Sequence, residues 1–84
     1  MDITNEIESI IKKAIPDAEV YVRDPQQDGQ HFEALVISAT FEKMPLVKQH
    51  QRVMNTLKTE FKENVHALAL KTMTPTQWAQ HQTQ

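Results

Sequence analysis

The histidines are the side chains best able to do chemistry in this sequence, because the chain has no cysteine. They are His31, His50, His66 and His81. None of them is paired at a local metal-ligand spacing such as His-x-x-x-His, so spacing alone predicts no zinc motif. Without cysteine the chain has no disulfide, no thiolate nucleophile and no sulfur ligand for a metal.

Each histidine has a structural interpretation beside a functional one. His50 falls on the apolar stripe of a predicted helix, which favours a packed core or interface histidine. His81 belongs to a polar segment, residues 80–84, that is expected to be a flexible, solvated tail. His66 begins a predicted strand and His31 opens another beside a loop. At these last two positions a structural and a functional role both stay open.

Hydrolase and transferase sequence motifs are absent. The single glycine, Gly29, cannot build a phosphate-cradling loop of the Walker or Rossmann kind. No serine stands in a Gly-x-Ser-x-Gly elbow, and Ser9 and Ser38 are interpreted as a helix-surface residue and a strand end. The sequence therefore predicts a protein that binds a partner and is not an enzyme.

Length and composition predict one small globular domain over residues 1–84. The chain is 39% hydrophobic and carries a net charge of −2, which suits one modest core and gives no overall basic character. No signal peptide is recognised, and the longest apolar stretches are far shorter than a membrane span requires. Together with the missing cysteines, this leads us to expect a cytoplasmic protein without a membrane partner.

Hydrophobic periodicity and turn residues predict three helices and three strands in the order helix–strand–strand–helix–strand–helix. A first helix ends at Pro16, because the residue before a proline is pushed out of the helical region. Thr74 and Gln77 form a capping box that starts the last helix, with Met73 and Trp78 at the positions of a hydrophobic staple. The remaining elements are two strands at 18–23 and 31–39, a long helix from 45 to 64 and a strand at 65–73.

The long helix is expected to cross over between two parallel strands. Gln49 is assigned to its solvent side, and its apolar stripe is predicted to contain Leu46, His50, Val53, Leu57 and Phe61, widened by Val47 and Met54. A hairpin followed by such a crossover gives a mixed three-stranded sheet. The predicted class is α+β, with the helices packed mainly on one face of the sheet.

Four short motifs together resemble the BolA family. They are His31-Phe32, Val47-Lys48-Gln49-His50-Gln51, Val65-His66-Ala67-Leu68 and Thr74-Pro75-x-x-Trp78. The likeness runs from the first helix to Trp78, and the combination is specific although each piece alone is weak. It implies the BolA fold, a relative of the type II KH arrangement. The short loop between the first two strands and the overall length look most like the IbaG acid-stress branch.

The resemblance implies a partner and a cofactor. BolA-like proteins pair with monothiol glutaredoxins of the Cys-Gly-Phe-Ser type and share a [2Fe-2S] cluster with them. In that arrangement the glutaredoxin and glutathione supply thiolates, and the BolA protein supplies the imidazole of its Val-His-Ala-Leu motif, here His66. A second ligand usually comes from the loop between the first two strands, where the nearby histidine is His31. The implied role is an adaptor in iron–sulfur trafficking or in iron and stress sensing.

Two alternatives stay open beside cluster sharing. Members of the family have been proposed as DNA-binding transcription regulators, and a local basic surface could be formed by Lys43, Lys48, Arg52 and Lys71. Against this, the chain lacks the Gly-x-x-Gly clamp of KH domains, and charges on a helix usually mark a solvated face. The other alternative is a heterodimer with glutaredoxin that holds no cluster. The sequence does not decide whether the free protein forms a homodimer.

Overall fold

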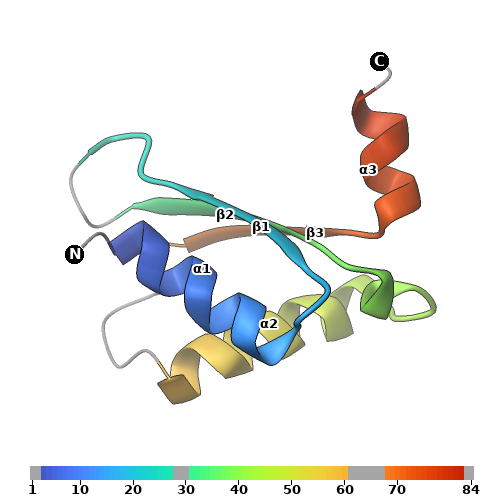
Figure 1. The fold of residues 1–84 in the computed structure, drawn as a ribbon, viewed down its shortest axis with the longest axis horizontal. Coiled ribbons are helices and arrows are strands. Elements are labelled where there is room, and N and C mark those ends of the chain that lie inside the picture. Colours follow the sequence, from blue (N-terminus) through green and yellow to red (C-terminus); the bar gives the residue numbers. More distant parts are fainter. Residues whose placement is uncertain (1–2, 28–30, 61–67, 83–84) are drawn as a thin grey trace.

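The computed structural model describes residues 3–27, 31–60 and 68–82, which fold into the six elements that the sequence predicts, in the same order (Figure 1). A short 3-10 helix, Ala39–Phe41, is added after the second strand. The main elements are α1 (Ile3–Ala14), β1 (Glu19–Arg23), β2 (Phe32–Ile37), α2 (Leu46–Glu60), β3 (Leu68–Met73) and α3 (Pro75–Gln82). The predicted ends at Asn64 and Val65 lie outside the described residues.

The sheet is mixed and has the order β1-β2-β3, as predicted. β1 and β2 form an antiparallel hairpin in which Val20 lies opposite Val36. β2 and β3 run parallel, with Phe32 opposite Leu68 at one end and Ile37 opposite Met73 at the other. Parallel neighbours cannot be joined by a tight turn, so the chain between them makes the crossover that contains α2.

The core lies between one face of the sheet and the two longer helices, which lie on the same side of the sheet (Figure 1). Alternate strand residues such as Val20 and Val36 point into it, and α1 contributes Ile7 and Ile11 at a spacing of one helical turn. Complete burial of each such side chain stabilises the fold by about 1.5–3 kcal/mol. The predicted packing of the helices mainly on one face is confirmed. Neither α1 nor α2 covers the opposite, open face, which α3 borders.

The buried stripe of α2 differs from the predicted one in its first turn. Val53 and Leu57 are fully buried as expected, but Leu46 and Val47 are 60% and 66% exposed. Leu46 shares the helical face of Val53, yet it borders a hollow beside the edge of β3 that no other element fills within the described residues. The assignment of Gln49 to the solvent side is wrong, because this side chain is only 7% exposed.

Gln49 can be buried because both the nitrogen and the oxygen of its side-chain amide form hydrogen bonds. Its Nε2 donates to the carbonyls of Met44 at 2.8 Å and Phe41 at 3.3 Å, and its Oε1 accepts from the Thr72 hydroxyl at 2.7 Å. Thr72 is itself buried in β3. One amide therefore links the crossover helix, the segment that precedes it and the strand that follows it, and a buried amide is tolerated when it is bonded in this way.

Asp17 forms a second polar link, between the end of α1 and the end of β2. Its carboxylate oxygens lie 2.9 and 2.8 Å from the Ser38 hydroxyl, and they accept from the Ala39 amide at 3.1 Å and from the Thr40 hydroxyl at 3.2 Å. These hydrogen bonds, above all that from Ser38, lower the pKa of Asp17 below its ordinary value of 3.8. Ser38, interpreted from the sequence as a strand end, directly follows β2 and is buried.

The last helix begins as the sequence predicts. The Thr74 amide donates to Gln77 Oε1 at 2.9 Å, and the Gln77 amide donates to the Thr74 hydroxyl at 3.2 Å, which completes the capping box. The helix continues through Gln82, so residues 80–82, which were expected to lie in a flexible tail, belong to α3.

Replacing Asp17 tests its link and the sign of its pH dependence. We expect Asp17→Asn to lower the free energy of unfolding by about 1 kcal/mol at pH 7, as the loss of a capping carboxylate does. Because the pKa of Asp17 is lowered in the folded state, its contribution is complete above about pH 4 and is lost as the pH falls further. Urea denaturation at pH 7 and at about pH 3 should therefore show that the difference in free energy of unfolding between the wild type and Asp17→Asn is smaller at the lower pH. Glu42→Gln, at an exposed site, is the matched control and should leave stability unchanged at both values.

Gln49 and Thr72 should behave as one unit. Gln49→Leu removes the donor to Met44 and leaves the buried Thr72 hydroxyl without its acceptor, so we expect a loss of about 1–3 kcal/mol. In the double variant with Thr72→Val, both polar partners are gone, and the total loss should be smaller than the sum of the two single losses. A double-mutant cycle by urea denaturation measures this. Additive losses would show that the bond between them contributes nothing.

Candidate metal centre

His31 is the residue that directly precedes β2, and its side chain is exposed. His66, the principal expected ligand, lies outside the described residues. In the sequence it stands two positions before Leu68, the first residue of β3. Because β2 and β3 are parallel and Phe32 pairs with Leu68, the strand starts that follow these two histidines are neighbours. The described residues therefore bring together the starts of β2 and β3, and in the sequence His31 and His66 stand shortly before these two strand starts.

The described part of the chain contains no group of three or more His, Cys, Asp or Glu side chains that could hold a metal ion. The loop after β1 offers Asp24, which is half-buried, while Asp28 lies outside the described residues. Since the sequence has no cysteine, any thiolate ligand must come from another molecule. The donors available here are imidazoles, which suit iron as a minority of a cluster's ligands.

The other two histidines lie away from these strand starts. His50 is half-buried in α2 and borders the hollow beside β3, together with Leu46 and Gln77. His81 is exposed on α3, where its ring stacks on Trp78 with the ring centroids 5.8 Å apart and the planes 21° apart. It borders two hollows and is part of a helix, whereas the sequence suggested a residue in a solvated tail.

The open face of the sheet carries a groove that the sequence did not single out. It runs along α3, and among its lining residues are Tyr21, Arg23, Leu35, Lys71 and Trp78. The rings of Tyr21 and Trp78 lie 6.0 Å apart, centroid to centroid. The available sequence signal was the alternation of β1, whose odd-numbered residues are all exposed, but nothing local indicated that Trp78 would approach them.

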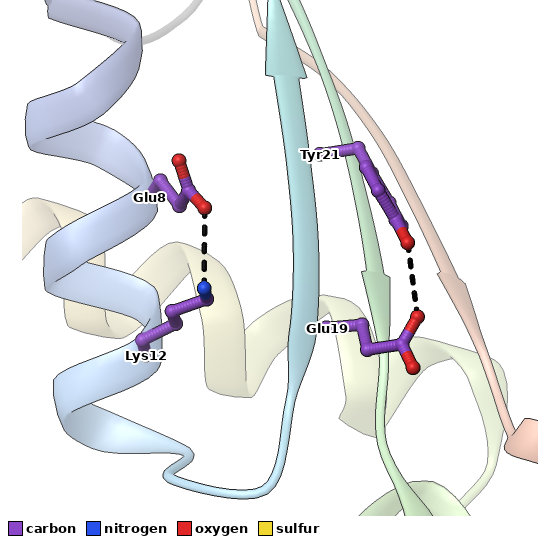
Figure 2. A network of polar contacts seen from close by, with 4 residues as sticks. All are labelled: Glu8, Lys12, Glu19 and Tyr21. Carbon is purple, nitrogen blue, oxygen red and sulfur yellow. Dashed lines mark hydrogen bonds and ion pairs between the residues drawn. The ribbon is translucent and has the colours of Figure 1, made fainter.

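Tyr21 is held on this open face by a bond within its own strand. Its hydroxyl donates to Glu19 Oε2 at 3.0 Å, and Figure 2 shows both side chains on the side of β1 that faces away from α1. The hydrogen bond and the negative charge of Glu19 raise the pKa of Tyr21 above its ordinary value of 10.0. At neutral pH the phenol therefore stays a neutral hydrogen-bond donor.

The four basic residues proposed for nucleic acid do not form one surface. Lys48 and Arg52 are exposed one turn apart on α2, and Arg52 also donates to the Ala14 carbonyl at 3.5 Å. Lys43 is exposed in the turn before that helix, with a left-handed φ of 70°. Lys71 points to the open face of the sheet, since its neighbour Thr72 bonds to α2 on the other face.

None of the described helices is both long enough and apolar enough to span a membrane.

Comparison with known proteins agrees with this fold. The family model described as BolA-like protein matches residues 4–77. The acid stress protein IbaG of Escherichia coli is 36% identical over 76 residues, which cover 89% of this chain and 87% of the relative. The DNA-binding transcriptional regulator BolA of Haemophilus influenzae is 41% identical over 54 residues, which cover 63% of this chain and 52% of the relative.

The solved structures agree as well. A BolA homologue from Coxiella burnetii superposes with a TM-score of 0.77 at 34% identity, covering 94% of this chain and 99% of that one. The sequence motifs, the order of the elements and the mixed sheet all lead to the same assignment: the chain belongs to the BolA family.

Proposed function

We propose that this protein is an adaptor that pairs with a monothiol glutaredoxin of the Cys-Gly-Phe-Ser type and shares a [2Fe-2S] cluster with it. The observation that carries the proposal is the parallel pairing of β2 with β3, which joins the strand starts next to His31 and His66 in the sequence. Membership of the BolA family supports it, because the family resemblance implies this partner.

The donor set favours a shared site over one held by this chain alone. Iron–sulfur clusters take thiolates at most ligand positions, and this sequence has none to give. We propose that the glutaredoxin and glutathione supply the thiolates and that His66 supplies one imidazole. Histidine in place of thiolate raises the reduction potential of a cluster and gives it a ligand that a proton can displace. Such a site suits transfer or sensing better than electron transport.

His31 is the proposed second ligand from this chain. It is exposed, so a partner docked at the starts of β2 and β3 can reach its ring without opening the core. Its neighbour Phe32 is buried, which anchors the backbone at that point. His50 and His81 border the hollow beside the edge of β3, and they have no part in the proposed site.

A titration into cluster-loaded monothiol glutaredoxin tests the proposal. We expect a one-to-one heterodimer and a changed visible circular-dichroism spectrum, because an imidazole replaces one of the ligands. His66→Ala should remove the changed spectrum while leaving the melting temperature of the free protein nearly unaltered. His31→Ala should weaken the signal without abolishing it. His81→Ala, an exposed histidine on α3, is the matched control and should behave as the wild type does.

His50→Ala separates a structural histidine from a ligand in the same assay. Because His50 is half-buried in α2, we expect its truncation to cost about 1 kcal/mol of stability and to leave the spectrum of the heterodimer intact. An unchanged spectrum on mixing the wild-type proteins, both folded, would contradict cluster sharing. Loss of folding in His66→Ala with the spectrum retained would contradict the choice of ligand.

DNA binding is the second candidate, because one relative is named a DNA-binding transcriptional regulator. The four candidate cations are spread over two faces of the described structure, and the net charge is −2. We therefore expect binding to duplex DNA to be weak and to fall steeply as salt rises, as non-specific phosphate contact does. Fluorescence anisotropy against salt measures this. A dissociation constant below about 10⁻⁸ M for one sequence at physiological salt would reverse the ranking.

A further inference from the structure

β1 is an edge strand whose outer side is not paired within residues 3–27, 31–60 and 68–82. Beside it lies a hollow lined by Glu8 and Lys12 of α1 and by residues 18–22. An exposed edge presents a row of backbone donors and acceptors that a further strand can use. α1 therefore borders this edge without closing it.

The sequence of β1 complements itself when the strand is reversed. Its five residues are Glu-Val-Tyr-Val-Arg, with opposite charges at the two ends and an aromatic residue at the centre. If two copies pair antiparallel about a two-fold axis at Tyr21, Glu19 lies opposite Arg23 of the partner subunit. Val20 then lies opposite Val22 of the partner subunit, and the two tyrosines face each other. Opposite charges and aromatic residues at directly facing positions stabilise antiparallel pairs.

The faces of the strand agree with this register. Glu19, Tyr21 and Arg23 are all exposed, whereas Val20 is buried and Val22 half-buried. Facing residues in an antiparallel pair share a side of the sheet, so charged residues meet charged ones and valines meet valines. A shift of one residue would turn the two helical layers to opposite faces. A shift of two would break both Glu19–Arg23 pairs and place Tyr21 opposite a charged residue.

Glu19 and Arg23 can each bind a second partner in addition to the one within their own chain. Glu19 accepts from Tyr21 through one oxygen, and Arg23 pairs with Glu33 while its side chain is 74% exposed. A guanidinium carries five donors in a planar fork, and a carboxylate has two oxygens, so each group can bind within its own chain and across the two-fold axis.

We propose that the outer edge of β1 is a self-association surface, on which a second copy of this chain docks through antiparallel β1–β1 pairing centred on Tyr21. The product is a six-stranded sheet with the longer helices of both copies on one face and the two aromatic grooves on the other. Such an isologous contact closes on itself and gives a dimer without further growth. It needs no metal and no glutaredoxin.

Sedimentation equilibrium on the full chain, from about 10 µM to about 1 mM, tests the proposal. The wild type should show a concentration-dependent monomer–dimer equilibrium. Glu19→Arg and Arg23→Glu should each weaken it about tenfold or more, because two opposite-charge pairs become two like-charge pairs. An equimolar mixture of the two variants should form a heterodimer, since every facing pair is then complementary. The double swap Glu19→Arg/Arg23→Glu should restore the homodimer.

Charge reversals outside β1 are the controls for a general effect of net charge. Glu42→Arg and Lys58→Glu alter the net charge by the same amounts at exposed positions outside β1, and they should dimerise as the wild type does. A wild type that stays monomeric at about 1 mM would overturn the proposal. So would single variants that dimerise normally, or folded single variants that fail to associate when mixed. If a single variant does not fold, the double swap decides, because it keeps the net charge and the complementarity.

Discussion

The parallel pairing of β2 with β3 is the constraint on which the rest of the structure depends. Two neighbouring strands that run the same way need a long connection, and here that connection contains α2. The crossover places α2 beside α1 on one face of the sheet, so that among the described helices α3 alone borders the other face (Figure 1). It also makes the starts of β2 and β3 neighbours and leaves β1 at the opposite edge. The core, the groove and the candidate ligand positions all follow from that one choice of strand direction.

Three polar links with structural roles lie at the other end of these strands. Asp17 bonds to Ser38 just after β2, Gln49 bonds to Thr72 near the end of β3, and the capping box of Thr74 follows directly. The first two are short-range bonds between elements that hydrophobic packing alone would leave free to slide, since packing has little direction. The strand starts carry the exposed His31 instead. The links made by Asp17 and Gln49 and the histidine proposed for a partner thus lie at opposite ends of the strands.

The sequence predicted those features whose cause is local. The capping box at Thr74 and the end of α1 before Pro16 depend on residues a few positions apart, and both are confirmed. Gln49 was misplaced because its burial depends on acceptors and a donor contributed by Phe41, Met44 and Thr72, which only the folded chain brings together. The approach of Tyr21 to Trp78 escaped prediction for the same reason. The role of His66 stays a prediction from family resemblance, as it lies outside the described residues.

The crossover also sets an order of events during synthesis. The hairpin joins β1 to β2 through a short loop, whereas Phe32 must wait for Leu68, 36 positions later (68 − 32), before their strands can pair. Contacts between such distant residues close slowly, and β3 is the last of the three described strands to leave the ribosome. Until then β2 is itself an edge strand, and its inward residues Ala34 and Val36 lack the cover that the finished core gives them. The nascent chain is therefore most exposed to misassociation just before β3 emerges.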